Sequence, residues 1–137
     1  MKSGDTLIRL AKHKVDSVQK LIMAAEQTRA GVVQKRDDLA AKYERESANA
    51  ARDPSIMGNW VAYAKVVNAQ NANLDASIAG MDEQITALRI DLQGAFEEQK
   101  KFEMLEERRQ ARIASSKSKR EQAFMDEMAL VRASRVA

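Results

Sequence analysis

The sequence predicts an all-α protein in which two long helices form an antiparallel coiled-coil hairpin, the second helix being longer. Only one proline, Pro54, occurs in 137 residues. One heptad pattern runs up to this proline and a second one runs away from it. Alternating steps of three and four residues place each pattern on one narrow stripe of a helix. Only another helix covers so narrow a stripe, and the nearest one is the other half of the same chain.

The first helix is predicted from about residue 5 to about residue 51. Its stripe is mostly apolar, but Arg29 and Arg36 also lie on it. We expect their stems to lie in the seam while the guanidinium groups reach outward, toward carboxylates across the hairpin. The helix must end near Arg52, because residues before a proline avoid the α conformation. The two series of the stripe are Ile8, Val15, Ile22, Arg29, Arg36, Tyr43 and Ala50, and Ala11, Val18, Ala25, Val32, Leu39 and Glu46.

A turn is predicted over about residues 52–59. Asp53 followed by Pro54 is typical of an N-cap with proline at the first helical position, which starts the second helix at once. The alternative is a longer loop that ends at Gly58, and the longer loop is our prediction. The second helix then runs from about residue 60 to about residue 133. Its stripe series are Trp60, Val67, Leu74, Met81, Leu88, Ala95 and Phe102, and Met57, Ala64, Asn71, Ile78, Ile85, Leu92 and Gln99.

The second helix outlasts its partner within what we expect to be a single domain of residues 1–137. Pairing ends at about residues 101–107, which leaves residues 108–137 as a C-terminal overhang. Phe102, Ile113 and Phe124 are spaced by eleven residues there, a period that unwinds a left-handed supercoil. The overhang holds 8 Lys and Arg against 3 Asp and Glu, whereas the preceding residues hold 15 against 17. A basic extension implies an acidic partner surface.

Composition excludes several function classes. Cysteine is absent, so there is no disulfide framework and no thiolate metal site. No run of 18 apolar residues exists to span a bilayer, and the N-terminus becomes charged too early for a secretory signal; we expect a cytoplasmic protein. A two-helix rod offers no enclosure for acid–base groups, and the sequence has no glycine-rich phosphate loop. We therefore expect no enzyme activity, no catalytic residues, no metal and no cofactor.

Three of the six aromatic residues, Tyr43, Trp60 and Tyr63, cluster near the turn. Trp60 falls on the stripe and is expected in the core. Tyr63 lies off the stripe and is expected to be exposed. Exposed aromatic side chains at the tip of a rod are suited to docking another protein.

The basic stretch of residues 107–120 has two interpretations. Lys and Arg side chains bind the phosphates of nucleic acids. However, no aromatic residue lies among them to stack on a base, and Glu107 and Glu121 flank them. Protein docking is therefore favoured, and no nucleic acid is expected as a partner.

Three segments resemble the family of the flagellar export protein FliJ: LIRLAKHKVDSVQKLI near the N-terminus, DPSIMGNWVAY at the turn and KKFEMLEERRQAR late in the second helix. The resemblance covers essentially the whole chain. It implies a non-enzymatic coiled-coil stalk of the flagellar type III export apparatus. Such a stalk docks into the hexameric export ATPase and links it to the membrane export gate and to export chaperones. The resemblance further implies a cytoplasmic protein, peripheral at the cytoplasmic face of the inner membrane through its partners.

The resemblance also implies site residues. Gate docking is implied at Leu39 and Tyr43. We add Trp60 and Tyr63, aromatic residues near the turn, as further candidates for gate docking. Docking to the ATPase is implied at cations near both ends of the chain. We add Phe124 and Met128, apolar residues of the overhang, as further candidates for contact with the ATPase. The cations are Arg9, Lys12, Lys14, Arg108, Arg109, Arg112, Lys119 and Arg120.

Two other function classes stay open on the residues alone. A coiled-coil arm that binds nucleic acid would lose affinity steeply as salt is added. A holdase-like chaperone would clasp its clients between the helices, and a seam left uncovered in the free protein would favour it. The oligomeric state is also open.

Overall fold

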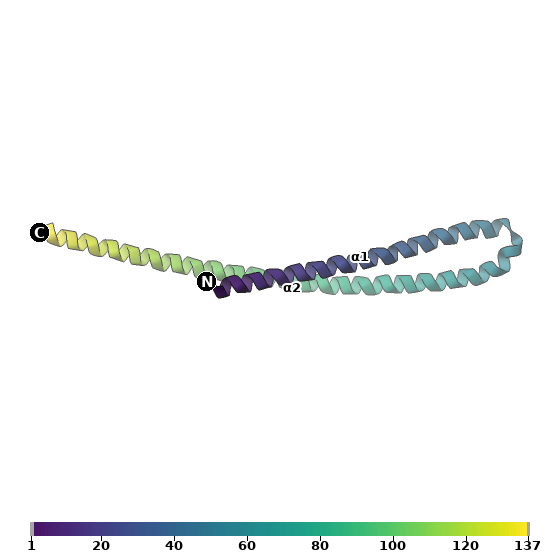
Figure 1. Cartoon of the computed structure of the whole chain (residues 1–137), viewed down its shortest axis with the longest axis horizontal. Helices are drawn as coiled ribbons and strands as arrows, with labels where there is room; N and C mark the ends of the chain where they lie inside the picture. The colour runs from purple at the N-terminus through teal and green to yellow at the C-terminus, as the bar shows by residue number, and fades with distance from the viewer. Residues whose placement is uncertain (1, 137) are drawn as a thin grey trace. The chain divides into compact units, whose positions relative to one another are not determined.

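The computed structural model describes residues 2–136, and the side chains of residues 4–55 and 58–136. It consists of α1 (Lys2–Arg52), one short 3-10 helix (Pro54–Ile56) and α2 (Met57–Val136), with no strand in the part described. The two α-helices pack antiparallel in a hairpin (Figure 1). The predicted all-α hairpin with a longer second helix is confirmed.

The chain divides into two compact units. The terminal unit comprises Met1–Lys14 and Ala95–Ala137, and the turn unit comprises Val15–Gly94. The terminal unit carries 14 Lys and Arg against 9 Asp and Glu, a net charge of +5, whereas the turn unit carries 9 against 11, a net charge of −2. Positive charge is therefore concentrated in the unit that holds both ends of the chain. The single-domain assignment stays a prediction.

The seam lies where the heptad patterns predict it. Every buried hydrophobic side chain in the described part belongs to one of the four predicted series. All of them are Ala, Val or Ile, whose small or β-branched side chains fill the narrow space between two helices. The buried residues are Ala11, Val15, Val18, Ile22, Ala50, Val67, Ile78, Ile85 and Ala95.

Two predictions about individual seam positions are wrong. Glu46 is exposed, and the neighbouring Ser47 is half-buried in its place, because a carboxylate without a partner does not leave water. Tyr63 was expected to be exposed, but it is half-buried against Tyr43. Met57, also assigned to the stripe, lies outside the described side chains.

The turn is shorter than predicted, and its capping residue explains why. The Asp53 carboxylate accepts hydrogen bonds from the backbone N–H of Ser55 at 3.0 Å and from its hydroxyl at 2.6 Å. This cap allows the 3-10 helix to begin at Pro54 and to lead directly into α2, so Gly58 lies inside the helix and ends no loop. These two hydrogen bonds, the one from the hydroxyl more than the one from the N–H, lower the pKa of Asp53 from its ordinary value of 3.8. Because both bonds favour the charged carboxylate, they stabilise the folded chain above pH 3.8. This contribution is lost as the pH falls through the lowered pKa of Asp53.

Both helices extend beyond their predicted outer ends. α1 begins at Lys2 instead of about residue 5, because Gly4 and Thr6 are still half-buried. A Cβ at Gly4 would meet the Glu106 carboxylate, the flexible end of that side chain, which would have to shift. α2 continues to Val136 instead of about residue 133. Its last half-buried residue is Arg109, one residue past the predicted start of the overhang.

Candidate docking surfaces

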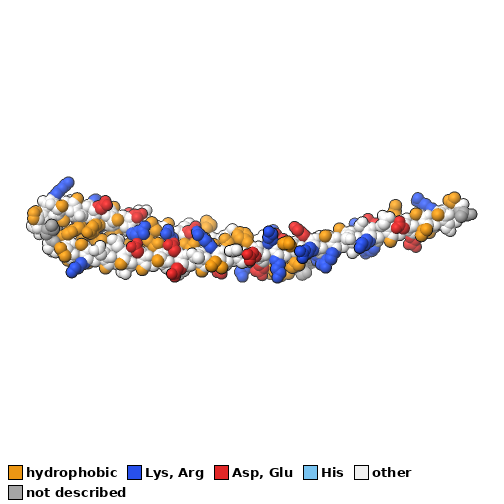
Figure 2. Space-filling view, turned by 180° about the vertical axis from the view of Figure 1, so that it is seen from behind, with side chains coloured by type: hydrophobic (Ala, Val, Ile, Leu, Met, Phe, Trp, Pro, Cys, Tyr) orange, Lys and Arg blue, Asp and Glu red, His pale blue; other side chains and the backbone are white. Residues whose placement is uncertain are grey.

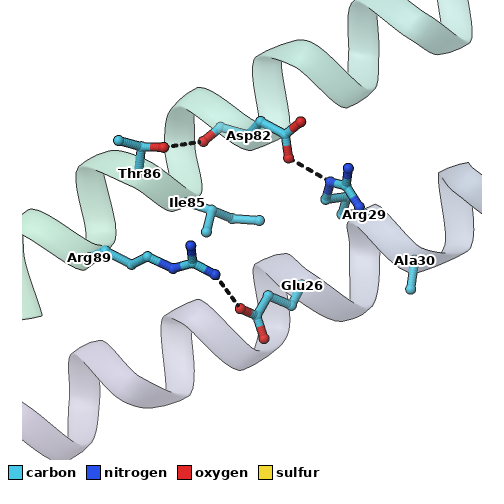
Figure 3. A pocket seen from close by; sticks show the side chains of 7 residues that line it. All are labelled: Glu26, Arg29, Ala30, Asp82, Ile85, Thr86 and Arg89. Atoms are coloured by element: carbon cyan, nitrogen blue, oxygen red, sulfur yellow. Dashed lines mark hydrogen bonds and ion pairs between the residues drawn. The ribbon is translucent and has the colours of Figure 1, made fainter.

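Charged side chains cross the seam in the turn unit. The guanidinium groups of Arg29 (Figure 3) and of Arg36 reach carboxylates of α2, as predicted. Arg36 follows Arg29 by seven residues along α1, and its partner precedes the partner of Arg29 by seven residues along α2. The two ion pairs therefore favour the same register between the helices. The three pairs are Arg29 with Asp82, Arg36 with Asp75 at 3.4 Å and Arg89 with Glu26 at 3.1 Å.

The Arg29–Asp82 and Arg89–Glu26 pairs line a groove of about 460 Å³, in which only Ile85 is both apolar and buried. Figure 3 shows positive and negative side chains alternating around it. Because each guanidinium shown there already faces a carboxylate, the groove presents no unbalanced charge to a ligand. It serves to hold the hairpin in register, and we assign no binding role to it.

Replacing Arg29 by Leu should stabilise the hairpin. The Arg29–Asp82 pair is partly open to solvent, at 39% and 52% side-chain exposure, and such pairs contribute about 0–1 kcal/mol. A Leu at this seam position buries apolar surface instead, so we expect a gain of about 1 kcal/mol in the free energy of unfolding. Urea unfolding followed by circular dichroism measures it. Thr28→Leu, one residue away and exposed, is the control and should change little. A loss above 1 kcal/mol for Arg29→Leu would show that the ion pair outweighs apolar burial.

The aromatic residues near the turn form one cluster across α1 and α2. Ring centroids lie 5.0 Å apart for Tyr43 and Trp60, 5.5 Å for Trp60 and Tyr63, and 6.5 Å for Tyr43 and Tyr63. All three side chains are half-buried. The Tyr63 hydroxyl is buried without a hydrogen-bond partner, which costs about 1–3 kcal/mol. The cluster therefore closes the seam and also holds a polar group whose bonding capacity is unused.

Leu39, the fourth gate-docking candidate, lies one helical turn before Tyr43. It is half-buried and lines a groove of about 330 Å³ together with Lys35, Gln70, Asn73 and Leu74. The structure thus places all four gate-docking candidates along one stretch of the turn unit.

At the end of the paired region, polar side chains replace the apolar seam. Glu106 accepts hydrogen bonds from Arg109 at 3.1 Å and from Gln110 at 3.0 Å. The Glu106 and Arg109 side chains are only 14% and 25% exposed. Arg109 is thus engaged within its own helix, which distinguishes it from the other cations proposed for ATPase docking.

The remaining candidates for ATPase docking are exposed, and all of them belong to the terminal unit. Every residue from 110 to 136 is exposed, including Phe124 at 62%. In Figure 2, Lys and Arg side chains are interspersed with hydrophobic ones along this part of α2. The exposed cations are Arg9, Lys12 and Lys14 on α1, and Arg108, Arg112, Lys119 and Arg120 on α2.

The sequence did not identify the exposed apolar residues that flank these cations. Leu7 and Leu10 of α1 and Met104 and Leu105 of α2 are all exposed in the terminal unit. Met104 and Leu105 lie with Lys101 and Arg108 around a groove of about 370 Å³. They fall between the heptad positions, so the heptad periodicity does not indicate them.

The described residues offer neither a membrane-spanning helix nor a metal site. Within residues 2–136, no helix is apolar over a stretch that would cross a membrane. Among the side chains that the structure describes, no group of three His, Cys, Asp or Glu is placed to hold a metal ion.

Comparison with known proteins identifies the family. The family model described as "Flagellar FliJ protein" matches residues 4–137. Proteins named "Flagellar FliJ protein" from two strains of Caulobacter vibrioides, NA1000 / CB15N and ATCC 19089 / CIP 103742 / CB 15, are each 29% identical over 128 residues, which is 93% of this chain and 92% of theirs. No solved structure matches significantly. The chain belongs to the FliJ family of flagellar export components.

Proposed function

We propose that the chain is a non-enzymatic stalk that docks into the ring of the flagellar export ATPase through its terminal unit. The observation that carries the proposal is the fully exposed helix of residues 110–136 in a unit of net charge +5. A helix without an intrachain partner offers its whole circumference to a surrounding protein. Its charge favours an acidic surface and accelerates the encounter with it.

Three of the exposed cations share one face of α2. Arg108, Arg112 and Lys119 are separated by four and seven residues, which correspond to about one and two helical turns. We call these three residues the basic face. Since Arg109 is bonded to Glu106, the basic face supplies the main electrostatic contact with the ATPase in this proposal.

The turn unit is proposed to contact the export gate and export chaperones. Support comes from the aromatic cluster of Tyr43, Trp60 and Tyr63, since aromatic side chains dominate the energy of many protein interfaces. A gate protein that offered an acceptor or donor to the buried Tyr63 hydroxyl would relieve an unsatisfied group. In this proposal the location at the cytoplasmic face of the inner membrane results from these protein contacts.

The alternatives receive less support from the structure. A holdase that uses its seam would need exposed seam residues, but the predicted apolar stripe is covered in both units. A nucleic-acid arm remains compatible with the charge of residues 110–136, although Phe124 is the only aromatic side chain among them.

The direct test is a binding titration of the full chain against the purified export ATPase, with duplex DNA and single-stranded RNA as competitors. We expect binding to the ATPase at physiological salt that neither nucleic acid displaces. Affinity for the ATPase and any affinity for nucleic acid should both fall as salt is added. The affinity for nucleic acid should fall more steeply, because binding releases counterions from its phosphates. Failure to bind the ATPase, or displacement from it by either nucleic acid at equal concentration, would contradict the proposal.

A further inference from the structure

Residues 110–136 carry a stripe that has no intrachain partner. Ile113, Phe124 and Val131 are separated by eleven and seven residues, so they lie on nearly one line along α2. All three are exposed, at 46%, 62% and 39%. Lys117, Arg120 and Glu127 flank this line within about 40° around the helix. We call these six residues the overhang stripe; its centre lies about 120° around the helix from the basic face of Arg108, Arg112 and Lys119.

The overhang stripe is complementary to itself when two copies run antiparallel. In one antiparallel register, Ile113 of one copy faces Val131 of the other, Lys117 faces Glu127, and Arg120 faces Phe124. A twofold axis repeats each contact, because the same patch serves both copies. A parallel pairing in register would instead place each cation of the stripe against its own copy and would be repelled.

Each facing pair is chemically favourable. Ile113 and Val131 cover apolar surface, and Lys117 and Glu127 carry opposite charges. Arg120 would lie over the ring of Phe124, a cation–π contact. Around Phe124 the structure has a groove of about 560 Å³, lined also by Lys117, Arg120, Glu121 and Met125, into which an arginine stem from a second copy would fit.

We propose that two copies of this chain associate antiparallel through the overhang stripe when no other partner is bound. Because only a few apolar residues take part, the dimer is weak and dissociates on dilution. It goes beyond the proposed ATPase docking: Arg120 and Phe124 are docking candidates that self-association covers, so the dimer would be a resting form that the ATPase must displace.

Charge exchange between Lys117 and Glu127 tests the proposal in the full chain. Sedimentation of the wild type should show dimer formation that rises with concentration. Lys117→Glu alone places Glu against Glu, and Glu127→Lys alone places Lys against Lys, each twice per dimer. We expect either change to weaken the dimer at least about tenfold. The double exchange should restore it, and so should an equimolar mixture of the two single variants.

This design separates contact between copies from effects within one helix. Residues 117 and 127 are ten positions apart, roughly 15 Å along the helix, so rescue in the double variant cannot come from a contact inside one chain. Leu130→Glu, at an exposed position off the stripe, is the matched control and should leave the dimer intact. Circular dichroism checks that every variant keeps its helices.

Three results would overturn the proposal. The first is a wild type that stays monomeric at about 1 mM, the weak end of specific binding. The second is a dimer that neither single variant weakens. The third is a pair of single variants that remain monomeric when mixed. If the wild type does not bind the ATPase, the proposed function is wrong, but the sedimentation results still decide whether the dimer forms. The two proposals can therefore fail independently.

Discussion

Substitution of Glu for Arg108, Arg112 and Lys119 should abolish binding to the export ATPase. The triple change reverses the basic face and takes the terminal unit from a net charge of +5 to −1. Each cation is exposed, so its replacement removes no packing and should leave the helical content unchanged. Like charges placed against an acidic surface slow association and penalise the complex. Titration calorimetry with the purified ATPase measures the effect.

The matched control reverses three exposed cations of the turn unit, Lys35, Arg45 and Lys65. It changes the net charge of the chain by the same amount but leaves the basic face intact. We expect this variant to bind the ATPase within about threefold of the wild type, because it leaves the proposed electrostatic contact unchanged. Equal loss in both variants would show that net charge alone, and no particular face, governs binding.

Truncation of Ile85 to Ala should destabilise the hairpin by about 2–4 kcal/mol. Ile85 is 5% exposed and lies in the seam of the turn unit beneath the Arg29 and Arg89 ion pairs. Its removal leaves a void that two helices have little freedom to close. The effect should lie below that of a full globular core, since a two-helix seam surrounds each side chain incompletely. Urea unfolding monitored by circular dichroism gives the value.

Ile90→Ala is the control for that measurement. It makes the same chemical change five residues later on the same helix and in the same unit, where the side chain is 66% exposed. Its expected effect is within about 0.5 kcal/mol. Similar losses at both positions would mean that the outer face of α2 is packed, which contradicts the two-helix seam.

The seam was predictable from sequence because burial in a hairpin follows one periodicity. The spacing of Val15, Ile22 and Val67 alone indicates which side of each helix is covered, and no other part of the fold competes for those positions. The turn was less predictable. Its length depends on whether the Asp53 carboxylate caps the following residues, and that geometry becomes visible only in the structure.

Tyr63 shows why a stripe underestimates burial by large side chains. It lies beside the seam, but its ring is long enough to fold back over the gap and to stack on Tyr43. The carboxylate partners of Arg29 and Arg36 were not predictable individually either, because they depend on the register across the turn. Likewise, the sequence placed Arg109 among the docking cations, whereas the structure pairs it with Glu106.

Amide hydrogen exchange over residues 110–136 tests the central claim that the exposed end of α2 docks into the export ATPase. In the free chain, at a dilution where copies do not associate, exchange should be fast, because an isolated helix gains no tertiary stabilisation. In the complex with the ATPase the same amides should become strongly protected, while seam amides around Ile78 and Ile85 stay protected in both states. Protection of residues 110–136 in the dilute free chain, or unchanged fast exchange there in the complex, would contradict the account.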